Sequence, residues 1–457
     1  MIQPVKLSDE QQALFEHIES SENNIFITGR AGTGKSTLLA HVIENTKKNV
    51  AVCAPTGVAA LNVGGSTIHS LFGFPFGLLG EVPLAKHMGR RTREILAAID
   101  MLVIDEVSMV SADLMDAISR ALGIARGRTK LPFGGAQVVM FGDPYQLAPV
   151  PPQTQEDRNY MAENYQSMWF FDAHVWREDS LERYELSQIF RQHDEGFKNI
   201  LNAIRVGQAT QEMIDYINQV GNKPTPHDDV IRLATINATV DSVNLNRLNR
   251  ITEPLKTFTA SFSAGDENAF GKTLPAEPAI NLKVGAQVMF IKNDDANTKR
   301  NAQGQMIKRW VNGTIGKVID LPKSGGVKVE VDHEVFDVGK STWEKVRYEI
   351  EEEFDEVTGK VKEVLVAVPI AEYQQIPLRL AWAVTVHKSQ GQTYEEALID
   401  MGSGAFSPGQ TYVALSRVRS LEGLYLNRPI RQSDIMVDPN VVRFMTGAIE
   451  IQEALFD

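Results

Sequence analysis

The sequence predicts an α/β fold of two lobes, each built on a parallel sheet, with a small β-rich insertion in the second lobe. Short apolar runs typical of buried parallel strands recur along the chain, and helix-like segments separate them. Between residues 256 and 374 this texture changes to β-branched alternation with turn signals. The chain has 457 residues, more than one hydrophobic core normally organises, so we expect two or three domains.

Four apolar runs define the first predicted lobe. They cover residues 24–28, 50–54, 101–104 and 136–141. Helical spacing of apolar residues follows in Lys35–Asn45 and Ala112–Gly123, and Ser111 stands where a capping residue would begin the second of these helices. We assign this lobe to residues 1–180, with a small insertion at about 72–96.

A second lobe is predicted after a Pro-rich, looped stretch at 150–155. Ile231–Ile236 resembles a buried strand and Ala238–Arg250 a helix. The β-rich insertion at 256–374 then interrupts the pattern, and α/β texture returns at Leu378. We therefore assign the second lobe to residues 181–255 plus 375–457.

Composition excludes several classes of protein. One cysteine, Cys53, excludes a disulfide framework and a zinc site of several thiolates. No apolar run is long enough to cross a bilayer, and the first residues lack the pattern of a secretory signal, so we expect a cytoplasmic protein without a membrane partner. The net charge of −12 opposes bulk binding to nucleic acid, so any nucleic-acid channel must be locally basic.

The strongest motif lies between the first predicted strand and the first long helix. Gly29 to Ser36 reads GRAGTGKS, the pattern of a phosphate-binding loop. Glycines let backbone N–H groups turn toward phosphates, Lys35 reaches the β and γ phosphates, and Ser36 can bind magnesium. The residues expected to hold the nucleotide are Gly29, Ala31, Gly32, Thr33, Gly34, Lys35, Ser36 and Thr37.

Two further strand ends carry polar residues suited to phosphate chemistry. Asp105 and Glu106 follow the apolar run at 101–104. We expect Asp105 to hold magnesium, together with Ser36, and Glu106 to orient and deprotonate the attacking water. Gln146 follows the next apolar run and could sense both water and γ-phosphate. Read alone, the Gly-Asp-Pro before it is also ordinary turn chemistry.

Arg191 and Arg417 are the arginine candidates of the second lobe. A planar guanidinium neutralises charge on a phosphoryl group in transfer. If these arginines act from a separate lobe, hydrolysis requires lobe closure, which converts chemistry into motion. For a single arginine the alternative is a surface ion pair.

The order of these motifs resembles superfamily-one DNA helicases, in the branch that contains the Pif, RecD and Dda helicases. The strings Ala54–Ala60 (APTGVAA), Thr67–Ser70 (TIHS) and Val386–Gly391 (VHKSQG) are most similar to the Pif group. The resemblance implies two RecA-like lobes with a small Src-homology-like barrel in the second lobe. It also implies ATP and Mg²⁺ as cofactors and 5′-to-3′ movement on single-stranded DNA, with fork or tailed duplex DNA as substrate and a monomeric motor.

The resemblance also implies roles at matching positions. Gln11 corresponds to an adenine-reading glutamine, and Gly391 to a nucleotide contact in the second lobe. The residues expected to touch the DNA strand are Pro55, Thr56, Thr67 and His69 in the first lobe and Thr385, His387 and Lys388 in the second. For either histidine alone, a satisfied core residue is the alternative.

Two segments and the overall function admit more than one interpretation from the sequence. Residues 74–79 lie where the family carries a strand-separating element, but a buried loop explains a short apolar stretch equally well. The acidic stretch Glu349–Glu356 is predicted as a solvated hairpin with its turn near Thr358. The net acidity also fits a nucleotide-dependent protein remodeller, and an RNA-directed motor is a further alternative.

Overall fold

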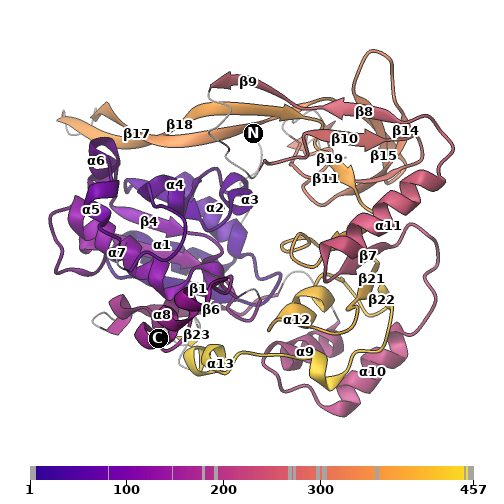
Figure 1. Ribbon diagram of the computed structural model, residues 1–457, viewed down its shortest axis with the longest axis horizontal. Helices are drawn as coiled ribbons and strands as arrows, with labels where there is room; N and C mark the ends of the chain where they lie inside the picture. Colours follow the sequence, from indigo (N-terminus) through magenta and orange to yellow (C-terminus); the bar gives the residue numbers. More distant parts are fainter. Residues whose placement is uncertain are drawn as a thin grey trace. The chain divides into compact units, whose positions relative to one another are not determined.

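The computed structural model describes residues 7–80, 82–146, 148–177, 181–189, 194–265, 270, 274–294, 299–300, 306–355, 360–446 and 449–450. The chain forms two compact units (Figure 1). The first unit comprises Leu7–Ile189, Glu344–Ile370 and Asp438–Asp457, and the second comprises Met1–Lys6, Phe190–Trp343 and Ala371–Val437. In the described part of the chain, no helix has both the length and the apolar character that a membrane span requires.

A seven-stranded sheet forms the centre of the first unit. Its order is β23-β6-β1-β5-β4-β2-β3, and every neighbouring pair is parallel. The four predicted apolar runs become β1 (Ile25–Gly29), β2 (Val50–Ala54), β4 (Met101–Ile104) and β5 (Gln137–Phe141). The parallel α/β architecture expected for this lobe is thereby confirmed.

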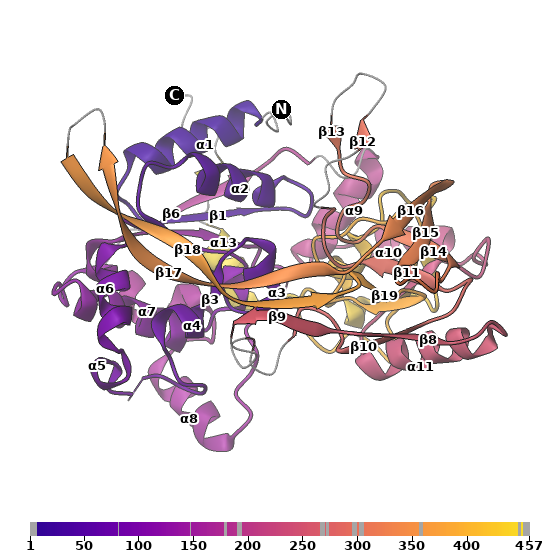
Figure 2. The ribbon, with the colours of Figure 1, turned by 90° about the horizontal axis from the view of Figure 1, so that it is seen from above.

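Helices cover both faces of this sheet (Figure 2). On one face, α1 (Asp9–Ser20) and α2 (Lys35–Asn45) bury Leu14 and Leu38 against side chains from the strands. On the other face lies α7 (Ala112–Ala125), which the Ser111 hydroxyl caps by accepting a hydrogen bond from Leu114 N–H, as predicted. Because both faces are covered, the central strands β1, β2, β4 and β5 are apolar at nearly every position.

The first lobe extends past its predicted boundary at residue 180. Strand β6 (Glu182–Leu186) pairs in parallel with β1 over its whole length. Only Tyr184 and Leu186 of this strand are buried, and charged residues fill the other positions. The continuous apolar signal of the central strands is therefore missing from β6, which explains why the sequence did not identify it.

Helix α13 (Pro439–Met445) and strand β23 (Ile449–Glu450) also belong to the first unit and not, as predicted for residues 375–457, to the second lobe. Helix α13 brings Phe444 onto Phe171, with ring centroids 4.2 Å apart. The Trp169 indole N–H donates to Asp438 at 2.8 Å. Beyond the helix, β23 pairs with β6. Aromatic packing and one strand pairing thus decide the assignment, and neither leaves a pattern in the local sequence.

The second unit contains a smaller parallel sheet. Its order is β20 (Ala383–Thr385), β7 (Ile231–Ala234), β21 (Ala397–Asp400) and β22 (Leu424–Leu426), with every neighbouring pair parallel. Helix α11 (Asn237–Arg250) packs against β20 and β7. The strand predicted at 231–236 and the helix predicted at 238–250 are both present, with slightly shifted ends.

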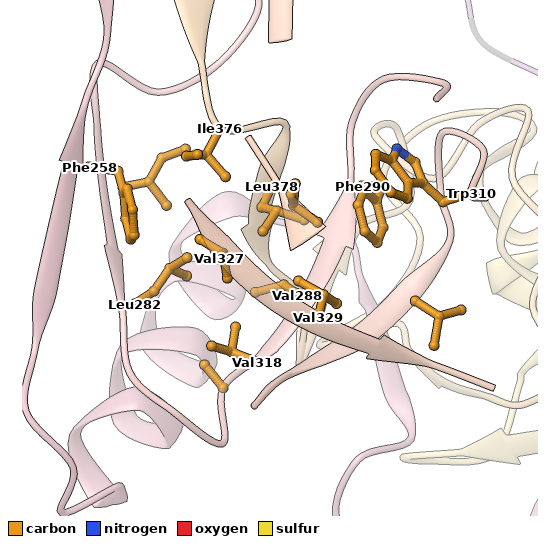
Figure 3. Packing of buried hydrophobic residues seen from close by; sticks show 14 of the residues in the cluster. Phe258, Leu282, Val288, Phe290, Trp310, Val318, Val327, Val329, Ile376 and Leu378 are labelled. Atoms are coloured by element: carbon orange, nitrogen blue, oxygen red, sulfur yellow. The ribbon is translucent and has the colours of Figure 1, made fainter. Parts of the chain in front are cut away.

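A β-rich module lies in the chain between α11 and β20. Its antiparallel five-stranded sheet has the order β16 (Glu334–Val338), β15 (Val327–Val331), β14 (Ile315–Asp320), β11 (Gln287–Phe290) and β19 (Leu378–Leu380). Figure 3 shows the hydrophobic core on this sheet, where Phe290 and Trp310 stack with centroids 4.4 Å apart. Because β19 pairs with β11, the module extends past the predicted end at 374.

A long hairpin contributes residues to both units. Its strands are β17 (Ser341–Asp355) and β18 (Lys360–Gln375), and their distal parts, within 344–370, group with the first unit. Tyr348 anchors them there, because its hydroxyl accepts a hydrogen bond from Val52 N–H at 2.7 Å. In the acidic stretch, Glu349 pairs with Arg91 and Arg347. The turn predicted near Thr358 lies outside the described residues.

Candidate functional site

The phosphate-binding loop connects β1 to α2. Gly32 and Gly34 have φ angles of 87° and 81°, which favour glycine at both positions. The Lys35 ammonium donates to the carbonyls of Gly29 at 2.6 Å and Arg30 at 3.2 Å, so it lies over the loop. Of the other predicted nucleotide contacts, Ala31 and Thr33 are buried, Thr37 is half-buried and Ser36 is exposed on the first turn of α2.

Gln11 reaches the same loop from α1. Its side-chain N–H₂ group donates to the carbonyls of Thr33 at 3.3 Å and Gly34 at 3.2 Å, while its side-chain oxygen accepts from Ser8 N–H. The amide is buried and ties the first helix to the loop. Adenine recognition by Gln11 therefore requires these bonds to be exchanged for bonds to the base.

Asp105 and Glu106 follow β4. Burial raises the pKa of Asp105 to about 6, and the Glu106 N–H and the charge of Lys35 oppose this shift. Glu106 itself has φ 50° and ψ 42°, a left-handed conformation that costs a residue with a side chain about 1–2 kcal/mol. A buried carboxylate near a lysine, next to a strained acidic residue, is an arrangement that proteins keep at functional sites.

Gln146 lies beyond the end of β5, and both it and Asp143 are buried. The Gln146 side-chain N–H₂ donates to the Asp143 carboxylate at 3.0 Å. A side chain at Gly142 would lie 3.1 Å from Val107 and 3.2 Å from the N–H of Ser108, so this loop packs tightly against the one that follows β4. Since β1, β5 and β4 are adjacent in the sheet, Lys35, Asp105 and Gln146 follow the same edge.

The first-lobe residues predicted to contact the DNA strand lie at or just after the ends of β2 and β3 (Ser66–Thr67). These two β-strands are neighbours, and Ala54 pairs with Thr67. The Thr56 hydroxyl accepts from Ala59 N–H and caps α3 (Gly57–Asn62). The Thr67 hydroxyl accepts from Ser70 N–H and caps α4 (Ile68–Phe72). Because each hydroxyl only accepts a hydrogen bond in its cap, its own O–H can still donate to a further acceptor. Pro55 is half-buried beside Thr56.

His69 is half-buried on α4 and stacks on Phe76, with ring centroids 5.2 Å apart. Burial lowers the pKa of His69, which favours the neutral ring at neutral pH. Phe76 is 92% exposed, whereas Phe74 and Leu79 are buried. The loop at 74–79 thus combines a buried base with one exposed aromatic ring, so neither of the two simple alternatives describes it fully.

The residues of the second unit that are predicted to contact the DNA strand lie on one tight loop at the end of β20. Thr385 is buried, and its hydroxyl accepts from Lys388 N–H at 3.2 Å. His387 and Lys388 are exposed, as is Gly391, whose φ is 79°. Burial lowers the pKa of His387. The His387 and Lys388 side chains therefore present an imidazole and an ammonium group from the same turn.

Arg417 is 1% exposed, and its buried side chain donates hydrogen bonds to this loop. Its guanidinium donates to the carbonyls of Ser389 at 3.5 Å and Gln392 at 3.4 Å, and to the Ser416 hydroxyl at 2.8 Å. It is therefore not a surface ion pair. The motif places this arginine in the sequence, but only the structure reveals that it supports the loop carrying His387 and Lys388. Arg191 lies outside the described residues.

Sequence reasoning missed two supporting contacts in the first unit. The Glu10 carboxylate accepts hydrogen bonds from the N–H of Ser187 at 2.8 Å and from its hydroxyl at 3.0 Å, which fixes α1 to the end of β6. Tyr348 of the hairpin lies against β2, the strand that leads to Pro55 and Thr56. Both join segments far apart in the chain, and no local motif marks them.

The chain is similar to known proteins in both sequence and structure. A family model described as PIF1-like helicase matches residues 6–227. The ATP-dependent DNA helicase Pif1 of Bdellovibrio bacteriovorus is 31% identical over 97% of this chain and 92% of its own. Animal and fungal relatives are longer, and the chain spans between 54% and 64% of their length.

The chain is also similar to solved structures of Pif1 helicases. A Bacteroides Pif1 in complex with ADP-AlF4 is 33% identical, with a TM-score of 0.84 over 97% of both chains. A second structure shows a Bacteroides Pif1 bound to single-stranded DNA, at 34% identity and a TM-score of 0.66 over 97% of both chains.

Proposed function

Because the chain belongs to the PIF1-like helicase family, we propose that it is an ATP-dependent DNA helicase that moves 5′ to 3′ along single-stranded DNA and unwinds duplexes. The observation that carries this proposal is the edge of the first sheet, where the polar ends of β1, β5 and β4 converge around a phosphate-binding loop. The direction of movement rests on family resemblance alone.

The first lobe supplies the chemistry of hydrolysis. The N–H groups of the glycine-rich loop and the Lys35 ammonium hold the phosphates of ATP. Glu106 orients the attacking water and accepts its proton, and Gln146 contacts water and γ-phosphate. The strained backbone of Glu106 supports its assignment, because such strain persists where the surrounding structure requires it.

The residues present fit a magnesium ion. Burial disfavours the charge on Asp105, so a nearby cation would stabilise that carboxylate. Ser36 offers a hydroxyl, and oxygen ligands of these two kinds suit Mg²⁺, which usually keeps water and phosphate oxygens as its other ligands. When bound, the ion would neutralise charge that develops on the phosphates.

The second lobe contributes Arg191 and Arg417 to this proposal. A planar guanidinium neutralises charge on the transferring phosphoryl group, an effect worth about 10³–10⁵ in rate in other phosphate-transferring enzymes. The contacts of Arg417 with Ser389 and Gln392 offer a link between the nucleotide and the DNA strand, because these two residues belong to the loop that carries His387 and Lys388.

The strand would be held by Pro55, Thr56, Thr67 and His69 in one unit and by Thr385, His387 and Lys388 in the other. Hydroxyls, N–H groups and Lys388 suit contacts with the phosphate backbone, which position a strand without reading its sequence. A Bacteroides Pif1 to which the chain is similar binds single-stranded DNA, which supports binding of a DNA strand by this chain. We propose a monomeric motor that acts on fork and tailed duplex DNA.

Unwinding of a duplex with either a 5′ or a 3′ single-stranded tail, with ATP and Mg²⁺, tests the proposal. We expect unwinding of the 5′-tailed substrate only, and none by the Lys35→Ala variant. ATPase stimulation by DNA and by RNA oligomers of one sequence separates a DNA motor from an RNA motor. An ATPase that neither oligomer stimulates would favour the protein remodeller.

A further inference from the structure

A cavity of about 390 Å³ in the second unit has no role in the proposed function. Three arginines line it, Arg232 from β7 and Arg247 and Arg250 from α11, together with Trp382. Val230 and Trp382 stand just before the strands β7 and β20, so the cavity lies toward the amino-terminal ends of these strands. The loop that begins at Thr385 leaves the opposite end of β20.

Helix α11 presents its basic residues to the cavity from one face. Val243, Asn246, Arg247 and Arg250 all line the cavity, at the spacing of neighbouring helical turns. Asn244 fixes the helix on the sheet, because its side chain both donates to the Ala383 carbonyl and accepts from the Ala383 N–H, each at 2.9 Å. The two arginines therefore stand at positions that the fold determines.

The acidic residues around these arginines leave their charge only partly compensated. Arg247 pairs with Asp228 at 2.8 Å, but the Asp228 side chain is 83% exposed, and exposed pairs contribute little. Arg232 lies 3.6 Å from Oδ2 of Asp400, a long ion pair, and the other carboxylate oxygen of Asp400 accepts from Gly402 N–H and from Asn427. Among the described residues Arg250 forms no ion pair within 4 Å, although the pKa of Asp228 is lowered by the hydrogen bond and charge of Arg247 and also by the charge of Arg250.

A purely structural reading explains only part of this cluster. Cations in the last turn of a helix interact favourably with its dipole, which accounts for Arg247 and Arg250. The helix dipole does not account for Arg232, which lies on a strand, forms a 3.6 Å ion pair with Asp400 and lines the same cavity. Three arginines also converge here in a chain of net charge −12.

We propose that this cavity binds a phosphate group through Arg232, Arg247 and Arg250. Guanidinium groups match phosphate oxygens with two parallel hydrogen bonds, which distinguishes them from lysine. The Asp228 carboxylate marks one position that a phosphate oxygen can occupy on Arg247. The phosphate comes either from a nucleic-acid backbone or from a free phosphate compound, and the two sources are separable.

Binding of inorganic phosphate, measured by calorimetry without ATP or DNA, tests the shared chemistry. Every protein in this test carries Lys35→Ala, which weakens phosphate binding at the glycine-rich loop. We expect Arg250→Ala and Arg247→Ala each to weaken binding about tenfold or more, the size expected for a charged hydrogen bond. Lys323→Ala, at an exposed turn of the β-rich module, is the matched control and should bind like its parent.

The salt dependence of binding to a single-stranded oligonucleotide identifies the source. The slope of log K against log salt is negative, and each lost phosphate contact reduces its magnitude by about 0.7. A less steep slope for Arg250→Ala than for Lys323→Ala indicates a nucleic-acid backbone, and an unchanged slope with weakened phosphate binding indicates a free phosphate compound. If Arg250→Ala matches Lys323→Ala in both measurements, the proposal is wrong. The phosphate measurement holds whether or not the chain is a helicase.

Discussion

At the scale of single residues, Glu106 combines a proposed chemical role with a measurable backbone strain. Replacing it with Gln keeps the shape of the side chain and removes the base. We expect ATP hydrolysis to fall about 10²–10⁴-fold, the range for a positioned general base, with nucleotide affinity retained. Steady-state ATPase rates and nucleotide titrations measure the two effects.

Two further variants complete this comparison. Glu106→Gly also removes the base, and it relieves a left-handed conformation that costs a side chain about 1–2 kcal/mol, so it should unfold at a higher denaturant concentration than Glu106→Gln. Glu16→Gln, at an exposed position of α1, should leave turnover unchanged. Normal turnover in Glu106→Gln would remove this residue from the mechanism.

Glu182 couples the stability of the first unit to pH. Burial opposes its ionisation, but hydrogen bonds from His17, Asn23 and Tyr184 outweigh burial and lower the pKa of Glu182. A lowered pKa stabilises the fold above the ordinary range of glutamate and loses this contribution as pH falls through the folded value. The stability difference between wild type and Glu182→Gln should therefore be present at pH 7 and shrink below about pH 4.3.

Urea unfolding of both proteins at a series of pH values measures this difference. The Glu16→Gln variant serves as the control, because its carboxylate is exposed and bonds only to the neighbouring Gln12 among the described contacts. A stability difference that is constant from pH 7 to pH 3 would show that the Glu182 carboxylate does not contribute through its ionisation.

At the scale of elements, the loop at 385–392 depends on the buried guanidinium of Arg417. Arg417→Ala removes the guanidinium donor to the carbonyls of Ser389 and Gln392; Ser389 still accepts from Gln392 N–H, so the loss falls mainly on the Gln392 carbonyl and on the packing around the buried side chain. We therefore expect loss of ATP turnover together with loss of stability and of single-stranded DNA affinity. Denaturant unfolding, ATPase assays and DNA titrations on one preparation test this coupling.

The conservative variant Arg417→Lys gives the matched comparison. A lysine can replace one of these hydrogen bonds but cannot spread its donors as a planar guanidinium does. It should retain more stability than Arg417→Ala while turnover stays low. If Arg417→Ala lost turnover with unchanged stability and DNA affinity, Arg417 would act on the nucleotide alone.

At the scale of the whole molecule, helix α13 and strand β23 join the unit that Leu7–Ile189 forms, although they lie near the other end of the chain. Phe444 packs on Phe171, Phe26 and Phe170, and the Arg183 guanidinium lies 5.2 Å from its ring centroid. Phe444 is half-buried, so Phe444→Ala should cost about half of the roughly 3–5 kcal/mol of a fully buried ring. Hydrogen exchange should rise in the first unit and stay unchanged in the second.

Val442→Ala is the control for this prediction. Val442 lies on the same short helix but is 39% exposed, so its removal should cost little. If Phe444→Ala raised exchange equally in both units, the two units would unfold together and the last residues would not belong to the first alone.

The sequence alone determined the parallel sheets, the capped helix α7 and the three polar strand ends. These features are local: burial on both faces makes a strand continuously apolar, and a phosphate-binding loop needs its glycines and lysine side by side. Tertiary structure alone decided that β6 and α13 join the first lobe, that Tyr348 lies against β2 and that Arg417 supports the loop after β20. Each of these depends on contacts between distant segments, whose energy comes from packing and buried hydrogen bonds that no local pattern records.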